Sequence, residues 1–511
     1  MNWTPQDITQ FTARHTTASK VSSDLLTFRK GISKIKLERA ATIGDGIVVL
    51  KPREERIFRT YFEERQSQYE VVKFVPASGA ATRMFKPLLA FLEASKQEDF
   101  SFGPYLQEHP QVSNFIKEAH KFPFHNLVLE QLPPDFSFES AQAVIDYLKI
   151  LLEAPGLDFG SKPKGLLPFH LKEGREVLVL EEHIAEALSY AVKDGVAKLH
   201  FTVSEGHLQA FEKALAQIKD SAVFEGKGAF EVQFSHQQLH TDTLVVSPDL
   251  QPLRDAQGHL MFHPAGHGAL LDNLASLKED VIFIKNVDNV GGAFSFEEQI
   301  HYKKVLGGKL LDVQEQLFAY ARALDEEVLE AADLEFMATY YQETFGVSLP
   351  SYYEEMLLEE QIAYLKETFN RPLRVCGMVE NEGKTGGGPF WVKDAMGTEH
   401  VQIVEASQIA LKDPEQSEIF ENATHFNPVD LVCSFKNYKG EGMDLHEFSD
   451  PSLSFIAEKS RHGKKVKVLE LPGLWNGSMA HWNTIFVEVP ASTFNPVKTV
   501  TDLLDPGHLE G

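Results

Sequence analysis

The chain has 511 residues, and its hydrophobic content of 43% is ordinary for a folded protein, which at this length usually comprises two or three domains. Its 49 basic and 74 acidic residues give a net charge of −25, which argues against nucleic-acid binding because that requires a broad positive face. Phosphate ligands remain possible where a few cations are concentrated locally.

The amino-terminal residues, MNWTPQDITQ, lack the charged and apolar regions of a signal peptide, and no run approaches the roughly 18 apolar residues of a membrane span. We therefore expect a cytosolic protein with no membrane partner. Cys376 and Cys433 both lie in apolar runs, which favours buried thiols over a disulfide or a nucleophile.

The α/β pattern begins after residues 1–70, which are predicted to be mostly helical. The β-branched run VVKFV (71–75) predicts a buried strand, small residues at 76–81 predict a tight turn, and a helical period runs over 82–94. Residues from about 96 to 160 are rich in Pro and Phe, and we interpret them as a helical insertion.

Helices and strands alternate again beyond the insertion, and this predicts a mostly parallel, twisted sheet with right-handed crossovers. A helical block is predicted over about 295–370, beginning at Ser295 in a capping-box pattern. Strand candidates return from 374 onward. The predicted domains are an amino-terminal region (1–70), an α/β core (71–410) and a small C-terminal α/β domain (411–511).

The turn after the first buried strand is a candidate phosphate-binding loop. A strand–turn–helix junction directs free backbone N–H groups and the positive end of the helix toward a ligand, and Arg83 adds a cation in the first turn. An ordinary turn with small residues for packing is an equally good interpretation of this segment alone.

Two lysines follow prolines at the start of predicted elements. Lys164 lies in GSKPKGLLPF and Lys498 in TFNPVKTVTDLL. Taken singly, the first is consistent with a solvated loop lysine, and the second with a helix that begins at a proline.

Two further segments are candidates for ligand contacts. Gly266 and Gly268 flank His267 just before a helical period, and glycines let a backbone approach a ligand closely. Asp288 follows the apolar run VIFIK, at the carboxyl end of a predicted strand, where open α/β sheets bind ligands. The structural alternatives are that the two glycines only allow the chain to enter a helix, and that Asp288 only caps a turn.

The order of these segments resembles that of the UDP-sugar pyrophosphorylases. The matching stretches are SGAATR (78–83), Pro163-Lys164, Gly266-His267-Gly268, Asp288-Asn289 and Pro496-Val497-Lys498. The resemblance covers about 71–90, 160–290 and 484–504 well, and 370–430 faintly. It differs at Ser78 and Ala81, where the family has glycines, and in the long separation of Arg83 from Lys164.

The resemblance implies a nucleotide-diphospho-sugar transferase (GT-A-like) fold and a reaction in which UTP and a sugar 1-phosphate yield a UDP-sugar and pyrophosphate. Its substrate partners would be nucleotides and sugar phosphates. It assigns catalysis to Arg83, Lys164 and Lys498 and a Mg²⁺ ligand to Asp288, because hard cations prefer carboxylate and phosphate oxygens. The substrate-binding residues that it implies are Ser78, Gly79, Ala80, Ala81, Thr82, Gln237, Gly266, His267, Gly268, Glu405 and Asn427.

Two alternatives remain open at this stage. The altered phosphate loop is consistent with a non-catalytic sensor or scaffold that binds nucleotide sugars. A glycosyltransferase of the same fold could use Asp288-Asn289 as its metal-binding pair, but it would need neither the Pro-Lys segment nor the loop arginine.

Overall fold

The computed structural model describes residues 3–79, 81–326, 328–381, 383, 386–394, 397–461 and 463–509. The chain divides into two compact units, each assembled from three stretches of sequence. Unit 1 comprises 1–71, 236–284 and 304–489, and unit 2 comprises 72–235, 285–303 and 490–511. The division into consecutive domains at 1–70, 71–410 and 411–511 stays a prediction.

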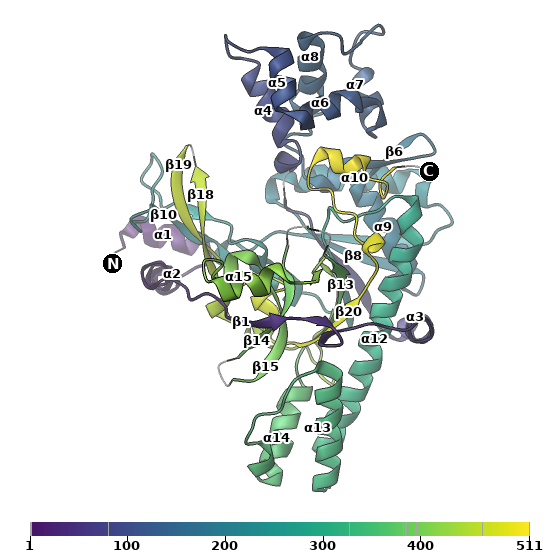
Figure 1. The fold of residues 1–511 in the computed structure, drawn as a ribbon, viewed down its shortest axis with the longest axis vertical. Helices are drawn as coiled ribbons and strands as arrows, with labels where there is room; N and C mark the ends of the chain where they lie inside the picture. Colours follow the sequence, from purple (N-terminus) through teal and green to yellow (C-terminus); the bar gives the residue numbers. More distant parts are fainter. Residues whose placement is uncertain are drawn as a thin grey trace. The chain divides into compact units, whose positions relative to one another are not determined.

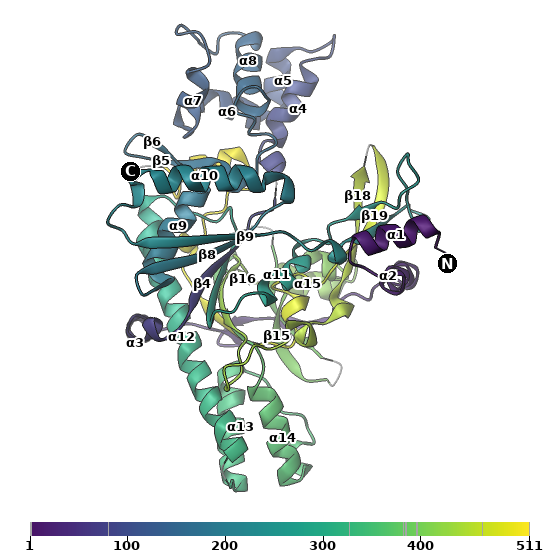
Figure 2. The same cartoon turned by 180° about the vertical axis from the view of Figure 1, so that it is seen from behind.

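Unit 2 is built around the strand β8 (Val196–Thr202). This strand pairs in parallel with β4 (Val71–Pro76) and with β9 (Ala229–Ser235), as the alternation of strands and helices predicted. Figure 2 shows the three strands side by side. The short strand β7 (Val192–Lys193) pairs with β8 in the antiparallel direction. The other elements here are β5 (Pro168–Lys172), β6 (Arg175–Leu178), α9 (Val179–Tyr190) and α10 (Leu208–Asp220).

Four helices lie in the segment predicted to be a helical insertion, and together with the helix that precedes it they form one cluster in both ribbon views (Figures 1 and 2). The high Phe content of this segment serves its core, since Phe115, Phe122 and Phe124 are buried there. The helices are α4 (Lys86–Ala94), α5 (Phe102–Glu108), α6 (Pro110–Lys117), α7 (His125–Leu129) and α8 (Ala141–Leu152).

The main sheet of unit 1 is mixed, so the prediction of a mostly parallel sheet is wrong. Strand β13 (Leu373–Glu380) is parallel to β20 (Asn483–Glu488) but antiparallel to β17 (Asp430–Ser434) and β16 (His425–Phe426). The strands β16 and β17 follow one another along β13, and both run opposite to it. The parallel strand β3 (Gly46–Val48) also pairs with β20.

Two smaller antiparallel sheets complete unit 1. The helices α1 (Pro5–Ala13) and α2 (Ala18–Lys30) bury Phe11, Leu25 and Phe28 against the first of them. That sheet contains β10 (Thr243–Val246), β11 (Phe262–His263), β18 (Phe455–Arg461) and β19 (Lys464–Glu470). The second contains β1 (Leu37–Ala40), β14 (Gly388–Lys393) and β15 (Glu399–Val404).

The predicted helical block begins earlier than its sequence pattern indicated. The helix α12 (Ala293–Glu326) already includes Ser295, whose hydroxyl donates to the carbonyl of Gly292. The predicted capping box at Ser295 is therefore wrong, because the helix starts two residues before it. The helices α13 (Ala331–Phe345) and α14 (Leu358–Phe369) follow and lie side by side in both views (Figures 1 and 2). The remaining elements are β2 (Thr42–Ile43), α3 (Pro52–Arg65), α11 (Leu271–Ala275), β12 (Val281–Lys285) and α15 (Pro414–Glu421).

Both cysteines are buried free thiols, as predicted. Burial raises the pKa of Cys376 to about 11, so that this thiol stays protonated and unreactive at neutral pH. Within the described ranges, no helix has the length and apolar character needed to cross a membrane.

Candidate functional site

Asp288 lies between two lysines that are distant from it in sequence. The Nζ atom of Lys164 donates to Asp288 Oδ2 at 2.8 Å, and the Nζ atom of Lys498 donates to the same oxygen at 2.9 Å. Asp288 is 7% exposed. Three residues that the sequence resemblance selected thus meet in one ion-pair cluster of unit 2, with two positive charges for one negative charge.

The two lysines of this cluster keep the carboxylate of Asp288 in its charged form. Burial acts to raise the pKa of Asp288, but the charges of Lys498 and Lys164 outweigh it and hold that pKa below its ordinary value. Burial lowers the pKa of Lys164, and the nearby Asp288 opposes that effect. A half-buried cluster with excess positive charge is suited to receiving the oxygens of a phosphate group.

Backbone hydrogen bonds bring the C-terminal segment to the end of β12. The N–H of Val497 donates to the carbonyl of Asp288, and the N–H of Asn495 donates to the side chain of Asn289. Val497 also accepts a hydrogen bond from Lys164 Nζ at 2.7 Å. These contacts fix Lys498 beside Asp288, so the Pro-Val-Lys sequence acts through strand-like pairing rather than as the start of a helix.

Gly165 explains part of the Pro-Lys-Gly sequence. A Cβ atom at this position would lie 2.8 Å from the buried ring of Phe211, which is closer than real Cβ contacts. The chain can therefore pack Lys164 against the end of β12 only because the next residue has no side chain.

The candidate phosphate loop lies next to the far end of the helical insertion. The N–H of Ala81 donates to the carbonyl of Lys162, and the hydroxyl of Thr82 donates to the carbonyl of Gly160. The two ends of the insertion therefore meet, although many residues separate them in sequence. Since its N–H is occupied and its side chain is fully buried, Ala81 offers a ligand no donor.

The remaining loop residues are open to solvent. Ser78, Gly79, Thr82 and Arg83 are exposed, and Arg83 has no ion-pair partner in the part of the chain that the structure describes. Ala80 lies outside the described residues. That Arg83 lines the same cleft as Lys164 stays a prediction.

A buried charge network supports the turn that carries Asp288. Glu186 of α9 accepts hydrogen bonds from Lys73 of β4 at 2.7 Å and from Lys285 of β12 at 2.9 Å. These three side chains are at most 2% exposed. His183, one turn earlier on α9, bonds to the carbonyl of Val287 through its Nε2 atom. No local sequence pattern marks this network, because Lys73 and Lys285 sit in otherwise apolar strands and Glu186 is one of several charged residues of α9.

The Lys73 pKa leads to a pH-dependence prediction. Burial lowers this pKa to about 7, whereas an unfolded lysine titrates near ~10.4. Between these values the unfolded state binds more protons, so the free energy of unfolding of the wild type should rise with pH relative to that of Lys73→Met. Urea denaturation of both proteins from pH 6 to pH 10 measures this difference. A constant difference across that range would contradict the prediction.

The predicted residues of unit 1 form a second cluster around His267. The Nε2 atom of His267 lies 3.4 Å from Glu405 Oε1, and its ring stacks on that of Trp475 with centroids 4.1 Å apart. The N–H of Leu474 donates to Nδ1 of His267, and Asn476 donates to Glu405 at 2.9 Å. The structure thus brings together two predicted residues, His267 and Glu405, and adds Trp475 and Asn476.

Gly266 and Gly268 are required by packing within the protein. Gly266 has a φ of +73°, and a Cβ there would lie 2.5 Å from a carboxylate oxygen of Glu470. A Cβ at Gly268 would lie 2.1 Å from the carbonyl oxygen of Pro472. The close approach expected of these glycines is therefore made to the segment after β19, and it is this contact that sets His267 on Trp475.

Several buried polar atoms near His267 lack hydrogen-bond partners within the described residues. They are Nδ2 of Asn427, Oδ1 of Asn476 and Oε2 of Glu470. Asn427 is next to Glu405, since its N–H donates to Gly387, whose Cβ position lies 3.4 Å from Glu405 Cγ. Unsatisfied buried polar atoms are rare in proteins, and each of these would be satisfied by an ordered water or by a polar ligand.

Gln237 differs from the other predicted residues of unit 1. Its Nε2 atom donates to Thr241 Oγ1 and Asp242 Oδ1, both at 3.1 Å, so its amide donors serve a local turn. Among the residues that the structure describes, no hydrogen bond links Gln237 to the His267 cluster.

Arg374 is the support of the His267 cluster that sequence analysis missed. This fully buried guanidinium donates to the Trp475 carbonyl at 2.6 Å, to Gln402 at 2.7 Å and to Thr484 at 2.8 Å. It therefore fixes the peptide below the His267–Trp475 stack. The Pro-Gly and Asn-Gly turns that bracket Trp475 were the available signal, because such turns often position functional loops.

Asp288 is the predicted metal ligand, and its surroundings define what it could hold. Among the described residues, no three His, Cys, Asp or Glu side chains are grouped to bind a metal ion. Mg²⁺ is usually held by one or two carboxylates together with substrate phosphates and water. Asp288 fits such a shared site if the two lysines leave its carboxylate and pair with the phosphates of an incoming substrate.

Comparison with solved structures gives similarities to two nucleotide-sugar pyrophosphorylases. The chain is similar to a UDP-glucose pyrophosphorylase variant from Leishmania major in complex with UDP-glucose, at 13% identity and a TM-score of 0.42, covering 98% of this chain and 77% of that one. It is also similar to a UDP-N-acetylglucosamine pyrophosphorylase from Trypanosoma brucei in complex with an inhibitor, at 11% identity and a TM-score of 0.47, covering 98% and 79%. No curated protein matches the chain. The model of the family described as "Domain of unknown function (DUF4301)" matches residues 4–509, and the chain therefore belongs to that family.

Proposed function

We propose that this protein is a nucleotidyltransferase of the GT-A-like fold that forms a UDP-sugar and pyrophosphate from UTP and a sugar 1-phosphate. The observation that carries the proposal is the cluster of Lys164, Asp288 and Lys498, which the motif order selected and which meets in space despite its sequence separation. In-line attack of one phosphate on another requires neutralisation and alignment more than proton transfer.

Each cation of the site in unit 2 would bind a different phosphate group. Lys164 would neutralise the α-phosphate of UTP, and Lys498 would neutralise the phosphate of the attacking sugar. Arg83 and the loop from Gly79 to Thr82, apart from the occupied N–H of Ala81, would bind the leaving pyrophosphate. Asp288 would hold Mg²⁺ jointly with phosphate oxygens, where the ion supplies additional charge neutralisation. Because the two lysines already occupy Asp288, we expect Mg²⁺ to bind tightly only when nucleotide is present.

Within unit 1 the proposal assigns the His267 cluster to the nucleoside and the sugar. The imidazole and Trp475 offer flat surfaces. Burial acts to raise the pKa of Glu405, but hydrogen bonds from His267 and Asn476 outweigh it, so that Glu405 is ionised. A carboxylate together with the Nδ2 donor of Asn427, which has no partner within the described residues, would bind sugar hydroxyl groups. Gln237 is kept as a candidate for the base only if its local turn opens.

The reaction itself is tested by incubating the full chain with UTP, Mg²⁺ and a panel of sugar 1-phosphates and detecting pyrophosphate. Production of pyrophosphate that depends on both substrates supports the proposal. Tight binding of UDP-sugars without turnover would favour a nucleotide-sugar sensor, an alternative supported by the occupied Ala81 N–H. Binding of neither substrate nor product would refute both.

Gly79 allows a test of the phosphate loop that spares the fold. A Cβ at Gly79 would contact nothing within 4 Å and its φ is not positive, so Gly79→Ala should fold normally. If phosphate approaches this backbone, the variant should bind UTP roughly tenfold more weakly, because a hydrogen bond to a charged group contributes about 1.5–3 kcal/mol. Gly103→Ala in α5 is equally open and serves as the control. Equal UTP affinity of both variants would remove the loop from the site.

A further inference from the structure

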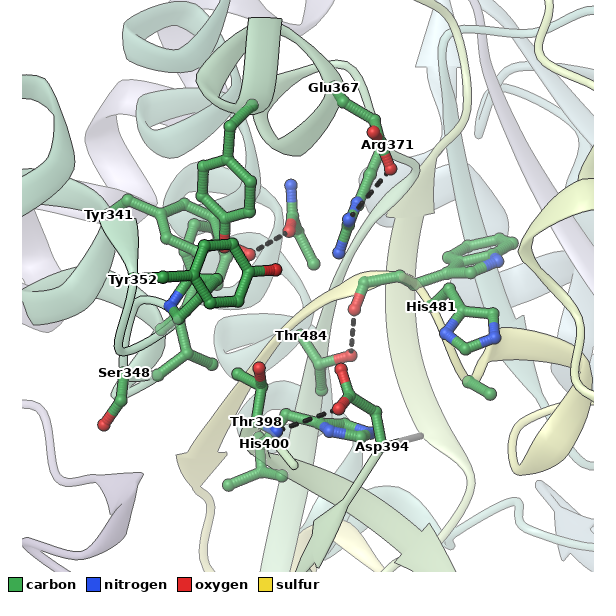
Figure 3. Close-up of a pocket in the computed structure, with 18 residues that line it drawn as sticks. Tyr341, Ser348, Tyr352, Glu367, Arg371, Asp394, Thr398, His400, His481 and Thr484 are labelled. Atoms are coloured by element: carbon green, nitrogen blue, oxygen red, sulfur yellow. Dashed lines mark hydrogen bonds and ion pairs between the residues drawn. The ribbon is translucent and has the colours of Figure 1, made fainter. Parts of the chain in front are cut away.

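Unit 1 contains a pocket of about 280 Å³ that the proposed function does not use. It is formed by the chain from α13 to α14, by the hairpin of β14 and β15, and by the segment leading into β20. Figure 3 shows Tyr341 and Tyr352 on one side of it and His481 on the other, with Arg371 between them.

Arg371 is the cation of this pocket, and most of its hydrogen-bonding capacity is unused. In the described part of the chain its one hydrogen bond runs from Nη2 to Glu367 at 3.4 Å. Glu367 is 78% exposed, whereas Arg371 is 29% exposed. A guanidinium has five N–H donors, and a long, solvent-screened ion pair of this kind contributes little. A carboxylate that entered the pocket could bind Arg371 in a bidentate manner and replace Glu367.

The opposite wall is aromatic and held in place. Tyr341, Tyr352 and Tyr364 line the pocket. The hydroxyl of Tyr341 donates to Asn483 at 2.9 Å, and Asn483 in turn donates to the carbonyl of Thr368. Because this wall is fixed before any ligand arrives, a planar ring could stack on it with little loss of side-chain freedom.

Besides Arg371, the pocket is lined by the carboxylates of Glu367 and Asp394 and by the imidazoles of His400 and His481. Burial lowers the pKa of His400, and the neighbouring charges of His481 and Arg371 lower it further, against the opposing effects of Thr398 and Asp394. Asp394 already accepts a hydrogen bond from the N–H of Thr398. His400 is therefore neutral at neutral pH, and an anion bound beside it would raise its pKa.

We infer that this pocket is a second ligand site, for a small molecule that joins one planar aromatic ring to a carboxylate. Arg371 pairs with the carboxylate, the tyrosines pack on the ring, and the volume of about 280 Å³ limits the ligand to about a single ring. The inference is independent of the proposed function, since the pocket shares no residue with the sites assigned to nucleotide, phosphate or sugar.

Calorimetric titration of the full chain at pH 7 with benzoate tests this site. Benzamide has the same ring without the charge, and acetate has the charge without the ring. We expect benzoate to bind at least tenfold more tightly than either. Arg371→Gln should weaken benzoate binding by at least tenfold, whereas Arg322→Gln, at an exposed position of α12, should not change it. Equal binding of benzoate and benzamide, or no benzoate binding at millimolar concentration, would overturn the inference.

His400 supplies a second readout that needs no change at Arg371. Its imidazole resonance, assigned with His400→Gln, should titrate at a higher pH in the presence of saturating benzoate and at an unchanged pH with benzamide. An identical pKa with and without benzoate would show that the anion binds elsewhere. This measurement decides the matter even if Arg371→Gln does not fold.

Discussion

Replacing Lys498 by alanine is expected to lower the rate of UDP-sugar formation by about 10²–10³-fold, with a much smaller effect on nucleotide affinity. Lys498 reaches Asp288 from an otherwise exposed position, and its side chain is 58% exposed. It is therefore free to leave the carboxylate and follow charge that develops on the phosphates. A group that acts mainly in the transition state lowers kcat more than it raises KM when it is removed.

Lys164→Ala should have an effect of the same size, because both ammonium groups belong to one cluster. The control is Lys162→Ala, two residues earlier, whose side chain lies over the ring of Phe159 rather than at Asp288. Steady-state kinetics of pyrophosphate release compares the three variants with the wild type. Similar rates for Lys162→Ala and Lys164→Ala would contradict the assignment of the Pro-Lys segment.

Replacing Glu186 by glutamine is expected to lower the free energy of unfolding by about 3–5 kcal/mol, the usual effect of breaking a buried ion pair. Lys73 and Lys285 would lose the carboxylate to which each is bonded, in surroundings where both are fully buried. Glutamine has nearly the same shape as glutamate, so the loss reports charge rather than packing. Urea denaturation at pH 7 measures it.

Two further variants establish the cause of that loss. Glu212→Gln changes an exposed glutamate of α10 and should alter stability by no more than a few tenths of a kcal/mol. The double variant Lys73→Met with Glu186→Gln should recover part of the lost stability, since it removes a buried amine that has lost its carboxylate partner. If the double variant is less stable than Glu186→Gln, charge is not the reason for the effect.

The strands and helices with strong periodicity were predicted from sequence, and the less regular ones were not. The apolar run VVKFV forms β4, and the helical period over 82–94 contains α4. The pairing of β10 with β19 was missed, because it joins segments more than two hundred residues apart through contacts that leave no local pattern. The capping box at Ser295 failed for a related reason. A capping pattern competes with packing in setting where a helix begins, and here α12 begins at Ala293, before the pattern.

The candidate site shows the same division. The sequence alone singled out Lys164, Asp288 and Lys498 by their positions after prolines and after a strand, and the order of these segments carried the family resemblance. It could not show that both lysines share one carboxylate, since backbone pairing between Asp288 and Val497 creates that contact.

The sequence by itself determined which chemical groups this protein has available, because short segments of it specify both the residue types and the local turns that expose them. Tertiary structure decided how those groups are used. In the folded chain the Ala81 N–H is bonded to the carbonyl of Lys162, and Gly268 packs against Pro472. The ring of His267 stacks on Trp475, whose carbonyl is bonded to the buried Arg374. Each of these outcomes depends on which distant segment packs against the residue, and the free energy of that packing is summed over the whole core rather than over any local pattern.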